Sequence, residues 1–114
     1  NFRSLYLVKG NMEIYNEIEI SQYANINYLG KFGIIDLDEK KIGVCHEPSY
    51  INNILKQEKC QIIFYGHTHK PWIETRNEVI QANPGTLGGV FTKATFAVWD
   101  SESGELELKI LERI

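Results

Sequence analysis

A strand-helix-strand pattern over residues 41–65 constrains the fold of this chain more than any other feature. Residues 41–45 and 61–65 are apolar runs that predict short buried strands, and residues 49–58 between them predict a helix. Two strands joined in this way pair in parallel through a right-handed crossover, so their carboxyl ends lie at the same edge of one sheet. The pattern therefore indicates an α/β fold and points to one edge of the sheet as the place for a site.

The helix is predicted from its first residue and from its apolar spacing. Ser49 is a good N-cap, because its hydroxyl can accept a hydrogen bond from the backbone at a helix start. Ile51, Ile54 and Leu55 follow at i, i+3 and i+4 and form one apolar stripe. We therefore expect a helix from Ser49 to about Glu58, which returns the chain to the second strand.

Histidines follow both predicted strands at the edge where their carboxyl ends meet. His46 comes directly after the first strand, and His67 and His69 follow the second strand between Gly66 and Pro71. Open α/β sheets place ligands at this edge, and neutral imidazole is the commonest metal ligand. Side chains at i and i+2 of an extended backbone point to the same side, so His67 and His69 can face one metal. The alternatives are two solvated loop histidines and, for His46, a capped surface histidine.

Length and composition indicate a single soluble domain over residues 1–114. A hydrophobic content of 43% and a charged content of 24% are ordinary for a globular chain that can bury a core. The net charge of -3, with no basic tract beyond Lys40-Lys41, argues against nucleic acid and anionic membranes as partners. No apolar run has the length of a membrane span. Cys45 and Cys60 form no CxxC unit and are expected to be reduced core thiols of a cytoplasmic protein.

The rest of the chain predicts further β-structure on both sides of this unit. Residues 5–8 predict a buried strand that ends at a Gly10-Asn11 turn. Asn11 offers an amide oxygen at a strand end, although Gly-Asn is also an ordinary turn dipeptide. Hairpins are expected from residues 31–37 with 41–45, from 72–75 with 78–81, and from 94–99 with 106–111.

Four motifs follow one another along the chain: Gly10-Asn11, His46, Gly66-His67-Thr68-His69 and Asn83-Pro84-Gly85-Thr86, the last of which predicts a turn. Together they resemble motifs of the calcineurin-like metallophosphoesterases, and of their small single-domain phosphodiesterases in particular. The resemblance implies a four-layer α/β/β/α sandwich with mixed sheets and a carboxy-terminal antiparallel hairpin. It implies that this chain is the carboxy-terminal two thirds of such a domain, because the family's opening Asp-x-His motif and its bridging aspartate would precede Asn1.

The resemblance also implies a reaction and a set of metal ligands. Asn11, His46 and His67 would bind the second metal of a dinuclear site, and His69 would bind the first. The family is a class of metal-dependent phosphoesterases, which hydrolyse phosphodiester or phosphomonoester bonds with a water or hydroxide held between two divalent metals. A small phosphate ester would be the substrate and Mn the first choice of metal, with Zn, Fe or Ni as other choices. A homo-oligomer is also possible on this interpretation.

One departure from the family pattern lies beside the predicted ligands, where Glu47 stands in place of a glycine after His46. The four predicted ligands are neutral, so we expect the 114 residues alone to bind divalent metal weakly. Two alternatives stay open. One is a non-catalytic protein-binding scaffold of the same fold with a degraded metal site, and the other is a generic α/β domain with loop histidines.

Overall fold

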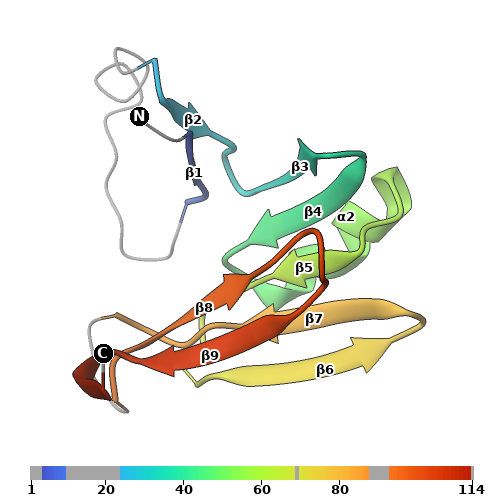
Figure 1. The fold of residues 1–114 in the computed structure, drawn as a ribbon. Coiled ribbons are helices and arrows are strands. Elements are labelled where there is room, and N and C mark those ends of the chain that lie inside the picture. Colours follow the sequence, from blue (N-terminus) through green and yellow to red (C-terminus); the bar gives the residue numbers. More distant parts are fainter. Residues whose placement is uncertain (1–3, 10–23, 69, 88–92, 114) are drawn as a thin grey trace.

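The computed structural model describes residues 4–9, 24–68, 70–87 and 93–113 of the chain. Its strands are β1 (Leu5–Leu7), β2 (Ile26–Tyr28), β3 (Phe32–Leu37), β4 (Lys40–Cys45), β5 (Ile62–Phe64), β6 (Trp72–Arg76), β7 (Val79–Asn83), β8 (Thr95–Trp99) and β9 (Leu106–Ile110). The helical segments are η1 (Pro48–Tyr50), α2 (Ile51–Gln57) and η2 (Leu111–Arg113). The strands form a parallel β1-β2 pair, a five-stranded sheet in the order β3-β4-β5-β7-β6, and an antiparallel β8-β9 pair (Figure 1).

The predicted strand-helix-strand unit is confirmed at the centre of the five-stranded sheet. Strands β4 and β5 pair in parallel, with Val44 opposite Phe64, and α2 lies in the connection between them. The predicted hairpin of β3 and β4 is antiparallel. Its turn residues, Asp38 and Glu39, have φ of 49° and 67°, which is the conformation that a tight two-residue hairpin turn requires.

The core lies between α2 and the face of the sheet that α2 covers. Ile54 from the helix and Ile63 from β5 are both 0% exposed and belong to one apolar cluster. Gly43 allows the helix to approach, because a Cβ at this position would lie 2.8 Å from Ile54 Cγ2. Cys45 and Cys60 are free and buried in this cluster, and burial raises the pKa of the Cys45 thiol to about 12. Both thiols are therefore core residues, as predicted.

The opposite face of the sheet is covered by the last hairpin. Alternate residues of β5 face opposite sides, so Phe64 faces away from Ile63 and α2. Phe64 lines a common hollow with Phe96 of β8. The described layers are thus α2, the five-stranded sheet and the β8-β9 pair (Figure 1). This mixed α/β arrangement confirms the predicted fold class, including the carboxy-terminal antiparallel hairpin.

Three local expectations of the fold differ from the structure. Residues 5–8 were expected to form a buried strand, but Leu5 and Tyr6 of β1 are 46% and 40% exposed. Ser49 is not the N-cap of the helix, because Pro48 begins a 3-10 turn in which Ser49 lies, and α2 begins only at Ile51. Asn83, which was expected in a turn, is the last residue of β7 and is 0% exposed. None of the helices in the described part of the chain has the length and apolar character to cross a membrane.

Candidate functional site

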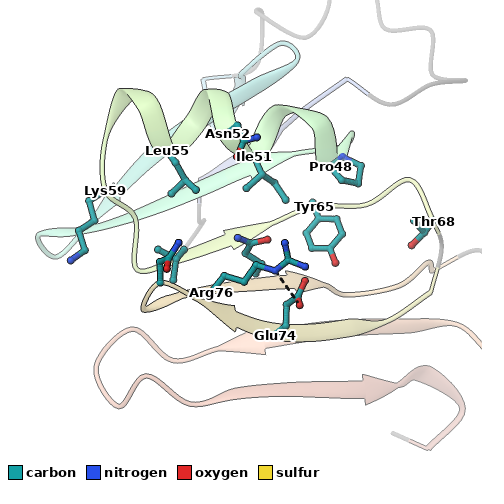
Figure 2. A pocket seen from close by; sticks show the side chains of 12 residues that line it. Pro48, Ile51, Asn52, Leu55, Lys59, Tyr65, Thr68, Glu74 and Arg76 are labelled. Carbon is teal, nitrogen blue, oxygen red and sulfur yellow. Dashed lines mark ion pairs between the residues drawn. The ribbon is translucent and has the colours of Figure 1, made fainter.

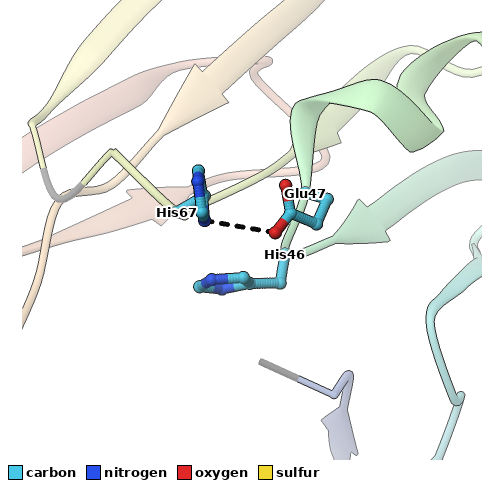
Figure 3. A group of neighbouring side chains, drawn as sticks. All are labelled: His46, Glu47 and His67. Atoms are coloured by element: carbon cyan, nitrogen blue, oxygen red, sulfur yellow. Dashed lines mark ion pairs between the residues drawn. The ribbon is translucent and has the colours of Figure 1, made fainter. Parts of the chain in front are cut away.

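His46, Glu47 and His67 form a cluster at the carboxyl ends of β4 and β5 (Figure 3). One ligand atom from each side chain can be chosen so that all three lie within 4.8 Å of one another. His67 Nδ1 lies 3.2 Å from Glu47 Oε1. The rings of His46 and His67 are nearly perpendicular, at 89°, and their centroids are 5.5 Å apart. Three side chains that could hold one cation therefore converge on a single point.

Parallel pairing of β4 and β5 brings the two histidines together, as the sequence predicted. The backbone N–H of Gly66 donates a hydrogen bond of 2.9 Å to the carbonyl oxygen of His46, which extends the contact of the strands beyond their ends. Gly66 also leaves room for the first imidazole, because a Cβ at this position would lie 3.2 Å from His46 Nδ1. A side chain larger than hydrogen would thus crowd the ring.

The backbone at His67 is a tight turn rather than the extended segment expected from the His-x-His spacing. Thr68 N–H donates a hydrogen bond of 3.0 Å to the carbonyl oxygen of Gly66, and the φ of His67 between them is +76°. This combination is a γ-turn of the rare, strained kind. Backbone strain of this sort persists where the surrounding structure fixes it, and such positions cluster at functional sites. The extended geometry was wrong because Gly66 and Thr68 close the turn through the backbone.

Asn83 supports the turn at His67 through hydrogen bonds of its side chain. Its Nδ2 group donates hydrogen bonds to Thr68 Oγ1 at 2.8 Å and to the carbonyl oxygen of Gly66 at 3.3 Å. Its Oδ1 atom accepts a hydrogen bond of 3.0 Å from Gly85 N–H. The buried amide therefore joins the Asn83-Pro84-Gly85 segment to the two residues that flank His67. Sequence analysis assigned this segment only to a turn and did not find this link.

The predicted ligands divide into those that the structure brings together and those that it does not describe. His46 and His67 are brought together, whereas Asn11 and His69 lie outside the described residues. Glu47 was not predicted as a member of this cluster, and its position directly after His46 gave no local signal, because adjacent side chains of an extended strand point to opposite sides. Two imidazoles and a carboxylate are donors that divalent ions such as Zn, Mn and Fe accept, so the donor set fits the implied metal.

A hollow of about 700 Å³, separate from the one that Phe64 and Phe96 line, lies between α2 and the β6-β7 hairpin (Figure 2). Strand register places Glu74 and Arg76 on the face of the sheet that α2 covers, and these two side chains form an ion pair of 3.3 Å. Pro48 and Thr68, which directly follow Glu47 and His67 in the chain, also line the hollow. Neither His46 nor His67 lines it. The cavity is thus a neighbour of the histidine cluster and carries a different set of side chains.

Comparison with known proteins relates this chain to phosphoesterases. A family model, the calcineurin-like phosphoesterase superfamily domain, matches residues 1–104. A phosphodiesterase of Methanocaldococcus jannaschii is 28% identical over 89 residues, which are 75% of this chain and 54% of that protein. The chain therefore spans about half the length of the curated relative that it matches.

Solved structures agree with the fold described above. The structure of an archaeal phosphodiesterase aligns with a TM-score of 0.78 at 23% identity, over 93% of this chain and 68% of that chain. The structure of Vps29 from Entamoeba histolytica in complex with zinc aligns with a TM-score of 0.60 at 18% identity, over 94% of this chain and 68% of that chain. These likenesses show the metallophosphoesterase fold.

Proposed function

The chain belongs to the calcineurin-like phosphoesterase superfamily, and we propose that its protein is a metal-dependent phosphodiesterase. The observation that carries the proposal is the convergence of His46 and His67 at the ends of two parallel strands, with a carboxylate beside them. The similarity to a phosphodiesterase of Methanocaldococcus jannaschii supports phosphodiesters as the substrate class. A small phosphate ester is the substrate that we propose.

In this proposal the histidines hold divalent metal. His46 and His67 serve one ion, together with Asn11, and His69 serves a second, with Mn as the first choice and Zn, Fe or Ni as others. Bound divalent metal would supply positive charge for the phosphoryl oxygens and lower the pKa of a water molecule. Neither nucleic acid nor a membrane is proposed as a partner, because the net charge of -3 favours neither anionic surface.

The residues around the histidines position them for this role. The side chain of His67 is 43% exposed, so a small substrate can approach it from solvent. Its backbone is fixed by the γ-turn and by Asn83, which limits the entropy that would be lost when the imidazole binds. Gly66 ties this turn to His46. The chain thus presents partly exposed ligands on a rigid support.

The first test is His67→Ala in the whole protein, with a chromogenic phosphodiester and Mn²⁺. We expect turnover to fall by about 100-fold or more, since loss of a supporting residue alone costs about 10- to 100-fold in such sites. Thermal unfolding followed by circular dichroism should stay close to wild type, because the side chain is partly exposed. Lys56→Ala, at an exposed position of α2, is the control and should leave turnover unchanged.

Two results would contradict the proposal in different ways. Wild-type turnover in the His67→Ala variant would show that the site has been assigned to the wrong residues. A wild-type protein that binds Mn²⁺ but hydrolyses no phosphodiester would favour the alternative, a non-catalytic protein-binding scaffold of the same fold.

A further inference from the structure

We propose that Glu47 is a ligand of the metal. It supplies negative charge to a site whose other proposed ligands, imidazoles and an amide, are neutral. The inference rests on the proposed function to the extent that the site binds a divalent cation. Glu47 directly follows His46 and belongs to none of the motifs that carry the family resemblance. The inference therefore concerns a feature of this chain.

The backbone places the carboxylate where it can reach the cation. Glu47 lies in the two-residue connection between the end of β4 at Cys45 and the start of η1 at Pro48. Consecutive side chains of an extended strand point to opposite sides, yet His46 and Glu47 both lie beside His67 (Figure 3). The close approach of all three ligand atoms makes a shared cation possible without a movement of the backbone.

The charge of Glu47 has little compensation within the described residues. Its side chain is 35% exposed, and its one ion-pair partner there is His67, which carries a charge only when it is protonated. No lysine or arginine of the described ranges forms an ion pair with this carboxylate. A partly desolvated carboxylate is costly unless an opposite charge is near, and a divalent cation between the three side chains would supply that charge.

A role that only orients His67 is the competing explanation. In many metal sites a carboxylate accepts a hydrogen bond from one imidazole nitrogen while the other nitrogen binds the ion. The 3.2 Å separation of His67 Nδ1 and Glu47 Oε1 would suit that role. An orienting role needs Glu47 to contact His67 alone, whereas a ligand atom of Glu47 lies within 4.8 Å of one from His46 as well as one from His67. The convergence of all three favours direct ligation.

The experiment is a Co²⁺ titration of the whole protein, followed by calorimetry and by visible absorption. Glu47→Gln keeps the shape of the side chain and removes its charge, and we expect it to weaken Co²⁺ binding by about 100-fold and to shift the Co²⁺ absorption bands. Glu58→Gln is the matched control, because Glu58 is a partly exposed carboxylate at the far end of α2 that pairs with Lys41 at 3.2 Å. It should leave both measurements unchanged.

The outcomes separate this inference from the proposed function. Equal affinity of Glu47→Gln and wild type, within about threefold, would overturn the inference while leaving the histidine site intact. Weaker binding with unchanged band positions would also overturn it, because Glu47 would then only orient His67. Failure of the wild-type whole protein to bind Co²⁺ would overturn the metal site itself and the inference with it. Unfolding followed by circular dichroism establishes that each variant is folded before titration.

Discussion

Strands β4 and β5 differ sharply between their interiors and their ends. In the interior, Ile62 and Ile63 are 0% exposed and Cys45 is 2% exposed, because α2 and the last hairpin cover the two faces of the sheet. Two residues beyond Cys45 and four beyond Ile63, the side chains of Glu47 and His67 are 35% and 43% exposed. The boundary between residues that hold the fold together and residues that can bind a ligand is therefore only two to four residues wide.

This difference follows from the layers. A parallel strand that is covered on both faces needs apolar side chains at every position, which explains the unbroken apolar run of β5. Beyond the last covered residue the backbone still lies close to its neighbour, but its side chains face solvent. Rigid backbone with partly exposed polar side chains is the combination that a binding site requires.

The largest effect on stability is expected in the interior. Ile63→Ala removes a fully buried side chain that packs with α2, and it should lower the free energy of unfolding by about 2–5 kcal/mol. Urea unfolding measures the loss, and Ile63→Val should cost only about 0.5–1.5 kcal/mol. Metal affinity of the folded fraction should stay at the wild-type value. A large loss of affinity in folded Ile63→Ala would mean that interior and end are not separable.

An intermediate effect on stability is expected from Asn83, which is buried like the strand interiors but supports the turn at the end of β5. Its side chain is 0% exposed, and its hydrogen bonds support the turn at His67. Asn83→Ala should lower the free energy of unfolding by about 1–3 kcal/mol, because Gly85 N–H loses its acceptor and the His67 turn loses its donor.

Unlike Ile63→Ala, Asn83→Ala should also weaken Co²⁺ binding, by about 10-fold, because the His67 turn is left less well fixed. Calorimetry on the folded variant measures this second loss. If stability falls while affinity is unchanged, Asn83 supports the fold alone and the turn at His67 does not depend on it.

The sequence predicted where the site lies better than it predicted which side chains form it. Parallel pairing followed from the strand-helix-strand pattern, and with it the convergence of His46 and His67. Glu47 could not be predicted in the same way, because its approach to His67 depends on how the chain leaves β4 and enters η1. The link from Asn83 to Thr68 joins residues 15 apart in the chain, and no local pattern indicates it. The roles of Asn11 and His69 stay predictions.

The smallest effect is expected from a conservative change at Thr68, which directly follows His67 in the turn. The extended backbone expected at His67 and His69 would turn Thr68 away from both histidines. The structure gives its hydroxyl a separate role. Oγ1 accepts hydrogen bonds from Asn83 Nδ2 at 2.8 Å and from Lys70 N–H at 3.4 Å. Thr68→Ser keeps this hydroxyl, so both the free energy of unfolding and Co²⁺ affinity should stay within about 0.5 kcal/mol of wild type.

Thr68→Val is the informative partner of that silent variant, because it keeps the shape of the side chain and removes the acceptor. The buried Asn83 amide would then lose its shorter hydrogen bond and keep the 3.3 Å bond to Gly66. We expect a loss of about 1 kcal/mol in the free energy of unfolding, measured by urea titration beside Thr68→Ser. Equal stability of the two variants would show that the hydroxyl does not support the turn. A large loss from Thr68→Ser itself would mean that the methyl group, rather than the hydroxyl, fixes His67 in place.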